Sequence, residues 1–306
     1  MHILEFGLPK HFRGGPAGVT IAGWLLRVAV LGFAIGALAS VLGQLGSGLG
    51  TYFFLEMGYT HPQVAPVERM VAYALLAFAI AAVIWPHWVL VLPITILVTA
   101  EACAHYINGG FPFAEWVIYA YALRIGTPLA LLVLCFAPLG RWIGPVHHLR
   151  VTGWVLRIAI AIVFAVHGTE ALMQHPRFID FIIGTTHNFT GHYLAESTVV
   201  WIMRVIGVVD IIVAILVIVK PHPAVLYWMA FWGLITALSR VTTYGIGHHY
   251  EVFVRTAHFL APIALLFVLN AQAAYGKDRQ KQSRPDTEAR ELPGRADGNG
   301  DPSPSV

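Results

Sequence analysis

The amino-acid sequence predicts an all-α polytopic membrane protein with eight transmembrane helices, arranged as two parallel four-helix repeats. Hydrophobic residues make up 57% of the 306 residues and charged residues 11%, whereas soluble domains carry about 25% charged residues. The mean hydropathy is +0.69. These values exclude an ordinary soluble enzyme, and a formal net charge of +3 is too small to favour a nucleic-acid partner.

Eight apolar runs are long enough to cross about 30 Å of hydrocarbon, which requires about 20 helical residues. They are residues 20–46, 66–85, 88–106, 115–137, 152–174, 197–219, 223–244 and 250–275. Prolines interrupt two longer apolar stretches. One is broken by Pro86 and the other by Pro221 and Pro223. Because proline cannot continue the helical hydrogen-bond ladder, each interruption predicts a tight turn between antiparallel spans. The expected partner of these spans is the lipid bilayer.

The distribution of Lys and Arg predicts the orientation of the chain. With the N-terminus inside, the inner segments hold eleven Lys or Arg residues and the outer loops hold only Arg177. The eleven are Lys10, Arg13, Arg141, Arg150, Lys220 and six in the C-terminal tail. We therefore expect both termini in the cytoplasm and a bacterial-type inner membrane. Residues 1–19 would be an inner N-terminal segment, residues 138–151 an inner linker, and residues 276–306 a disordered inner tail.

Short segments of the first half recur in the second half in the same order, at offsets of 130 to 135 residues. The pairs are residues 23–27 with 153–157, Arg69 with Arg204, and residues 128–132 with 262–266. This pattern predicts a first four-helix repeat at 20–137 and a second at 152–275, with the same orientation because each contains an even number of spans. The second copy carries His167, Glu170 and His258 where the first carries Ala37, Ser40 and Arg124.

Polar side chains inside the predicted spans collect in the outer half of the membrane. A charged group in hydrocarbon is costly unless it has a partner or a water-filled cavity. His167 and Glu170 share a helix face at i, i+3, and Glu101 and His105 share one at i, i+4. Ten residues from six spans reach this depth: Glu101, His105, Arg124, His167, Glu170, Arg204, Arg240, Glu251, Arg255 and His258. We expect an outward-facing polar cavity between the two bundles.

An alternative interpretation of these polar residues is structural, because buried Arg–Glu and His–carbonyl contacts also lock helical bundles together. Pairing of Arg124 with Glu115, or of Arg255 with Glu251, would be of this kind. Gly32 and Gly36, spaced as G-x-x-x-G, likewise indicate close helix packing rather than contact with a ligand.

The fifteen histidines raise the question of a bound metal or a b-type haem. A His-x-x-Glu pair such as His167 with Glu170 suits Zn, Fe or Mn. Only His105, His167 and His258 lie inside predicted spans, however, and no span contains a His-x-x-x-His pair. No metal ligand is therefore assigned, and a bound metal or haem is a less favoured alternative.

The segment that begins at Arg157 and reaches His167-Gly168 ten residues later resembles the first-helix signature of the DoxX/DoxD family of four-helix membrane proteins. His175-Pro176-Arg177-Phe178 resembles the loop that follows in that family. The resemblance covers residues 152–275 and is specific only within the first of these spans. It implies a subunit of a quinone-linked redox system, of which the best-known members oxidise thiosulfate. In the first half Ala37 occupies the position that corresponds to His167, which argues against two equivalent sites, one in each half.

The leading hypothesis is a membrane subunit that reduces quinone and oxidises a small sulfur compound. His167, Glu170 and His258 would be catalytic, because quinone reduction needs a hydrogen-bond donor to a carbonyl and a proton supply. Arg204 and Arg240 would hold an anionic substrate. The remaining binding residues would be Glu101, His105, Arg124, Glu251 and Arg255. Since no flavin or nucleotide motif is present, electrons would come from a partner subunit or a small donor.

The competing hypothesis is a membrane carrier, or an assembly factor or chaperone, without catalysis. Two four-span repeats with polar residues between them fit this function equally well. A scaffold subunit with no site of its own is a third interpretation. Whether the chain is an enzyme, and whether it forms homo-oligomers, are both left open by the sequence.

Overall fold

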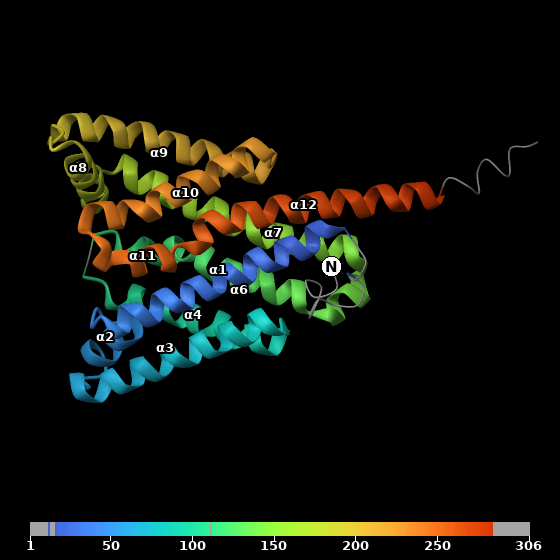
Figure 1. Cartoon of the computed structure of the whole chain (residues 1–306), viewed down its shortest axis with the longest axis horizontal. Coiled ribbons are helices and arrows are strands. Elements are labelled where there is room, and N and C mark those ends of the chain that lie inside the picture. The colour runs from blue at the N-terminus through green and yellow to red at the C-terminus, as the bar shows by residue number, and fades with distance from the viewer. Residues whose placement is uncertain (1–11, 13–15, 111, 284–306) are drawn as a thin grey trace, which may run out of the picture.

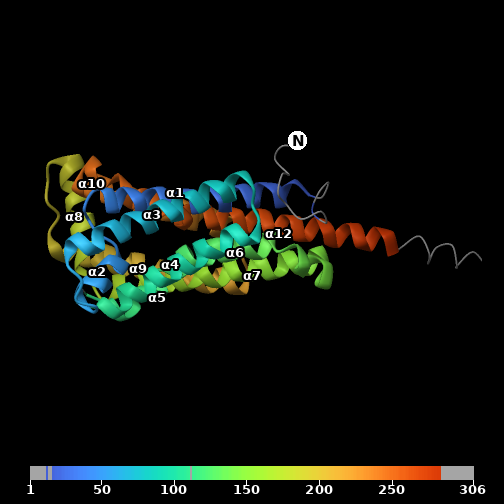
Figure 2. The same ribbon diagram turned by 90° about the horizontal axis from the view of Figure 1, so that it is seen from below.

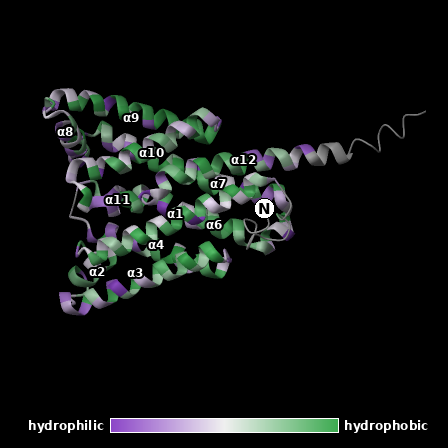
Figure 3. Cartoon of the chain, in the orientation of Figure 1, coloured by the Kyte–Doolittle hydropathy of each residue, from purple (hydrophilic) through white to green (hydrophobic). Residues whose placement is uncertain are grey.

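The computed structural model describes Phe12 and residues 16–110 and 112–283. Within this part of the chain, eight helical spans are long and apolar enough to cross a membrane, which confirms the predicted all-α polytopic membrane protein. The spans run along one common direction in two perpendicular views (Figures 1 and 2). Hydrophobic residues cover most of their length, and hydrophilic residues gather toward the ends (Figure 3).

The first half of the described chain consists of four spans and one short additional helix. In order these are α1 (Ala17–Leu42), α2 (Gly48–Leu55), α3 (His61–Ile84), α4 (Trp88–Asn108), and a fourth span made of the 3₁₀ helix η2 (Ala114–Trp116), α5 (Val117–Ala120) and α6 (Ala122–Cys135). The short helix α2 was not predicted.

The second half repeats this order of long and short helices. It consists of α7 (Ala137–Leu172), α8 (Pro176–Thr190), α9 (Glu196–Val219), α10 (Pro223–Tyr244), and a last span made of the 3₁₀ helix η3 (Ile246–His248), α11 (His249–Val254) and α12 (Thr256–Ser283). We call the end of the bundle that carries α2 and α8 the loop end. The opposite end, from which α12 projects, is the tail end (Figure 1).

The two predicted proline turns are confirmed, and each is completed by a histidine cap. The N-cap of α4 is His87, whose Nδ1 accepts a hydrogen bond of 3.4 Å from Val89 N. The N-cap of α10 is His222, whose Nδ1 accepts one of 3.3 Å from Ala224 N. These bonds satisfy backbone donors that lack partners inside the helix.

The predicted linker 138–151 is not a loop, because α7 extends through it from Ala137. The helix is interrupted only at Gly144, where φ is +76° and ψ is 163°. Glycine adopts such a conformation without steric cost, and Pro145 restarts the helix at a position where proline is favoured. His148 is buried here, with Nε2 2.6 Å from the carbonyl oxygen of Val133.

The start of the predicted tail is also helical, since α12 continues to Ser283 instead of ending at residue 275. Extension of an existing helix adds one hydrogen bond per residue without the cost of nucleation. The rest of that predicted tail, 284–306, lies outside the described residues. So do residues 1–11 and 13–15 of the predicted N-terminal segment, although Phe12 is buried against the ring of His148 at 5.1 Å.

The fourth and eighth spans are both interrupted near the loop end. The breaks fall at Tyr121, between α5 and α6, and at Arg255, between α11 and α12. They lie 134 residues apart, which is the offset at which residues 128–132 recur as 262–266. The internal repeat itself stays a prediction from the sequence.

The core lies where the two halves meet. The helix α7 packs against α6, α9 and α12, and α1 packs against α3, α11 and α12. Thr256 donates a buried hydrogen bond of 2.8 Å to the carbonyl oxygen of Ala29. A Cβ on Gly32 would lie 2.4 Å from Thr256 Cγ2, and one on Gly36 would lie 2.6 Å from the backbone of Val254. The prediction that these glycines serve helix packing is therefore confirmed.

Candidate functional site

A cavity of about 660 Å³ opens between the two halves at the loop end. Its wall combines polar and apolar side chains from both halves. Eight of the ten predicted site residues line it: Glu101, His105, Arg124, His167, Glu170, Arg240, Glu251 and Arg255. The prediction that polar residues from distant spans converge at one depth is thus realised for these eight.

The histidine cluster lies on the side of the cavity formed by the second half. His167 Nδ1 lies 2.8 Å from Glu170 Oε2, one helical turn further along α7. The imidazole of His258 on α12 stacks on that of His167, with ring centroids 6.1 Å apart. Phe178 contacts His167 edge-on at 5.9 Å. This arrangement fixes the orientation of His167 and places a carboxylate next to it.

His258 differs from the prediction in one respect, because it does not line the cavity. Its side chain is buried behind His167 at 5% exposure. The crossing of α10 and α12 is so close there that a Cβ on Gly233 would lie 2.4 Å from the carbonyl oxygen of His258. His258 can therefore act on a ligand only through His167.

Four of the described arginines contribute positive charge to the cavity wall, namely Arg124, Arg177, Arg240 and Arg255. Arg255 forms an ion pair with Glu251 one turn away, as the sequence suggested. The guanidinium of Arg124 lies over the ring of Tyr121 at 4.3 Å, and that of Arg240 lies over Phe181 at 4.2 Å. Arg124 therefore does not pair with Glu115. Among the described residues neither Arg124 nor Arg240 has a carboxylate within ion-pair distance, and the buried Nε atom of each lacks a hydrogen-bond partner.

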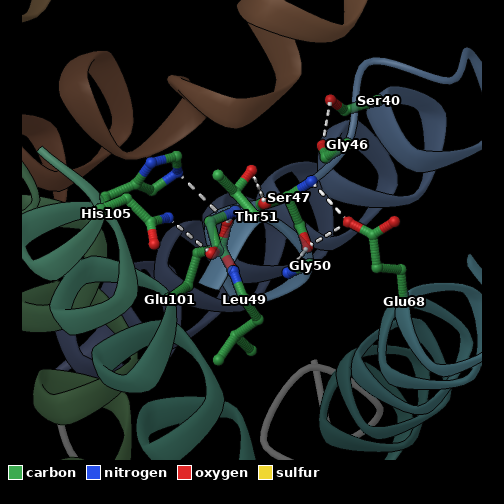
Figure 4. Close-up of polar contacts among 11 residues, drawn as sticks. Ser40, Gly46, Ser47, Leu49, Gly50, Thr51, Glu68, Glu101 and His105 are labelled. Atoms are coloured by element: carbon green, nitrogen blue, oxygen red, sulfur yellow. Dashed lines mark hydrogen bonds and ion pairs between the residues drawn. The ribbon is translucent and has the colours of Figure 1, made fainter. Parts of the chain in front are cut away.

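The opposite side of the cavity holds a carboxylate clamp on the short helix α2 (Figure 4). Glu101 on α4 accepts hydrogen bonds from Gly48 N at 2.5 Å and from Leu49 N at 3.1 Å. Glu68 on α3 accepts from both the backbone N and the Oγ of Ser47, each at 2.7 Å. These bonds satisfy backbone donors at the start of the helix and place negative charge at the positive end of its dipole.

His105 completes this clamp, since its Nε2 lies 3.2 Å from Glu101 Oε1. Its ring also packs against Tyr121 at 5.6 Å. A Cβ on Gly48 would lie 2.7 Å from the His105 ring, so the close approach of α2 requires glycine at this position. Glu101 and His105 thus position α2 in the cavity wall and are themselves exposed to the cavity.

Arg204 is the predicted site residue that the structure places elsewhere. It is exposed on α9, where its guanidinium lies over the ring of Trp201 at 5.1 Å. The face of α9 that packs inward carries Val199, Met203, Gly207 and Asp210. Arg204 lies about 100° around the helix from Met203, so its side chain cannot share that face. The structure therefore does not bring Arg204 to the cavity with the other candidates.

Several residues of the cavity wall were not predicted as site residues. The role of Glu68 could not be predicted from the sequence, because its partner Ser47 lies 21 residues away and no local pattern connects the two. Ser47 carries a detectable signal, since serine is a favoured N-cap, and it caps α2 by accepting a hydrogen bond from Gly50 N. His175, Arg177 and other loop residues enter the wall through folding of the loops.

His175 is buried between two aromatic rings at the loop end. Its ring stacks on Phe178 at 4.9 Å and on Phe113 at 5.0 Å, and its Nδ1 caps α8 by accepting a hydrogen bond from Arg177 N. Burial lowers the pKa of the His175 imidazole, and the nearby negative charge of Glu170 opposes that shift. The neutral ring is the form that can accept the capping bond.

The residues assembled here can donate and accept protons and can hold an anion. In the described part of the chain no three His, Cys, Asp or Glu residues are arranged to hold a metal ion. No family model matches the chain, and it has no match among curated proteins or solved structures. The resemblance of residues 152–175 to the DoxX/DoxD signature therefore stands on those residues alone.

Proposed function

We propose that this integral membrane protein is a DoxX/DoxD-like subunit that reduces a membrane quinone at the loop-end cavity. The observation that carries the proposal is the hydrogen-bonded pair of His167 and Glu170 in the cavity wall, backed by the stacked ring of His258. A histidine held by a carboxylate is a common donor in general acid catalysis. The aromatic side chains Tyr121, Phe178 and Phe181 supply flat surfaces for a quinone ring.

The chemistry requires two electrons and two protons for each quinone converted to quinol. In the proposed step the charged imidazole of His167, stabilised by the Glu170 carboxylate, donates a hydrogen bond and then its proton to the quinone. Glu170 then takes up a proton from water in the cavity and passes it to His167, and the second proton of the quinol follows the same path. The reductant would be a small sulfur oxyanion. With thiosulfate the balance is two thiosulfates and one quinone, plus two protons, giving one tetrathionate and one quinol.

The test is thiosulfate-dependent quinone reduction by purified protein in lipid vesicles, followed by the ultraviolet absorbance of the quinone. His167→Ala removes the proton donor, and we expect a rate at least about hundredfold lower. His147→Ala is the matched control, because His147 is exposed at the tail end. Equal rates for His167→Ala and wild type, at equal protein level, would contradict the proposal.

A second candidate function is a carrier for small anions, which is favoured by the guanidinium groups of Arg124 and Arg240, because neither has a carboxylate at ion-pair distance in the part of the chain that the structure describes. A carrier would exchange labelled thiosulfate or sulfate across a vesicle membrane without any quinone. Counterflow that persists in His167→Ala but is lost in Arg240→Gln would favour transport. Quinone reduction without counterflow would favour the redox function.

The topology proposed with this function places the loop end outside and both termini in the cytoplasm of a bacterial-type inner membrane. It rests on the eleven Lys or Arg residues of the inner segments against Arg177 outside. A redox partner subunit is needed only if the sulfur compound does not itself deliver electrons to the cavity.

A further inference from the structure

The loop-end cavity has an apolar arm that the proposed reaction does not use. The arm lies within the first half and is lined by side chains of α1, α3 and α4. They include Phe33, Ala37, Val71, Leu75, Leu97 and Val98. Phe33, Leu75 and Val98 belong to the hydrophobic core. A cavity wall of this composition binds hydrocarbon and gives no hydrogen bond to a polar ligand.

The arm reaches deeper into the membrane than Arg240 does. Leu75 lies fourteen residues from the loop-end start of α3, or about 21 Å along the helix, and Val98 lies ten residues, or about 15 Å, from the end of α4. Arg240 lies four residues, or about 6 Å, from the end of α10. The cavity is therefore charged near the loop end and apolar toward the membrane centre.

Two arginines near the loop end offer a site for an anion. The carboxylates of the wall are already engaged: Glu251 pairs with Arg255, Glu170 with His167, and Glu68 and Glu101 accept hydrogen bonds from the backbone of α2. Arg124 and Arg240 have no carboxylate within ion-pair distance among the described residues, and Glu251 interacts with both only at longer range. Arg240 is 7% exposed, and its Nη1 donates hydrogen bonds to Thr236 O and Ser239 Oγ. A buried guanidinium that contacts no carboxylate is costly, and an anionic ligand would lower that cost.

We propose that the cavity binds a single-chain amphiphilic anion, such as a long-chain alkyl carboxylate. Its head would lie between Arg124 and Arg240, and its chain would follow the arm between α1, α3 and α4. A volume of about 660 Å³ is that of a site for one small ligand. This ligand goes beyond the proposed redox function, since its binding requires no electron transfer.

The test uses a twelve-carbon carboxylate that carries a photoreactive diazirine in the distal half of its chain. After irradiation of the protein in lipid nanodiscs, we expect crosslinks on α1, α3 and α4 near Phe33, Leu75 and Val98. Unlabelled laurate should abolish these crosslinks. Dodecanol, which has the chain but no charge, and sulfate, which has the charge but no chain, should not. Crosslinks confined to lipid-exposed residues, or equal competition by dodecanol, would overturn the proposal.

Variants sharpen the same measurement. Arg240→Gln removes one charge of the head site. We expect the laurate concentration that halves the crosslinking to rise about tenfold or more. Arg204→Gln is the matched control, because Arg204 is an exposed arginine outside the cavity and its loss should leave competition unchanged. Equal competition in both variants would contradict a head site at Arg240. If Arg240→Gln fails to fold, the comparison of laurate with dodecanol on the wild-type protein still decides.

Discussion

Glu101 on α4 accepts a hydrogen bond of 2.5 Å from the backbone N of Gly48, the first residue of α2, although 53 residues separate them. The same carboxylate accepts from Leu49 N and pairs with His105. Without these bonds the start of α2 would leave donors unsatisfied in a partly buried site. The position of α2 in the cavity wall therefore depends on a charged residue of a distant transmembrane helix.

Replacement of that carboxylate should loosen α2. Glu101→Gln keeps the size of the side chain but removes its charge, and hydrogen bonds to charged groups contribute about 1.5–3 kcal/mol. We expect amide hydrogen exchange in residues 48–55 to become at least about tenfold faster, as mass spectrometry would show. Glu115→Gln, at an exposed position of η2, is the control and should change nothing. Equal exchange in the two variants would contradict the role of Glu101.

Close packing behind His167 gives a second prediction. In Gly233→Ala the new Cβ would lie 2.4 Å from the backbone oxygen of His258, so α10 and α12 must move apart. We expect a loss of about 1–3 kcal/mol in stability, visible as earlier thermal aggregation in detergent. Gly247→Ala adds a Cβ with no atom within 4 Å and serves as the control. Wild-type thermal behaviour of Gly233→Ala would show that the two helices are not held at this distance.

The pH dependence of stability should contain a contribution from His175. Because burial lowers the pKa of its imidazole in the folded state, the unfolded chain, with a pKa of about 6.5, binds the proton more tightly. The contribution of His175 is therefore present above pH 6.5 and is lost as the pH falls below it. Protonation also removes the Nδ1 acceptor that caps α8.

His175→Phe keeps a ring between Phe113 and Phe178 but cannot titrate. On going from pH 7.5 to pH 5, we expect the unfolding midpoint of the wild type to fall more than that of the variant. Intrinsic fluorescence during heating in detergent gives both midpoints. Parallel changes in the two proteins would show that His175 makes no such contribution.

Hydropathy and the length of the apolar runs predicted the spans, because a bilayer requires long apolar helices whatever their neighbours are. The limits of α9 and α10 agree with the prediction to within a residue. Residues 138–151 are predicted as a linker because they lie between the two four-helix repeats. The helix continues there because Gly144 absorbs the break in a single residue.

The sequence could predict which residues lie at the depth of the site in the membrane. Charged residues cluster where water reaches, so eight of ten candidates meet at one cavity. Which face of a helix points to the cavity was harder to predict. Arg204 lies on the exposed face of α9, and in so apolar a helix no sequence pattern distinguishes that face from the buried one. The partners of Glu68 and Glu101 could not be predicted, because they are backbone groups of a short helix whose place depends on the whole fold.

The proposed orientation predicts which ends of the molecule can be labelled from outside the cell. In a background with Cys103→Ser, which removes the exposed cysteine, Phe189→Cys places a thiol on α8 and Trp142→Cys places one at the tail end. Both side chains are about three-quarters exposed. A membrane-impermeant maleimide should label Phe189→Cys in intact spheroplasts and Trp142→Cys only after lysis. The reverse pattern would invert the topology.

The central claim is that His167 and Glu170 deliver protons to a quinone in the loop-end cavity, and the rate of quinol formation in Glu170→Gln tests it most directly. With thiosulfate as reductant, we expect this variant to be at least about hundredfold slower than wild type, because the glutamine cannot return a proton to His167. Arg204→Gln, outside the cavity, should keep the wild-type rate. Equal rates for wild type and Glu170→Gln, or no thiosulfate-dependent quinol formation by the wild type, would contradict the claim.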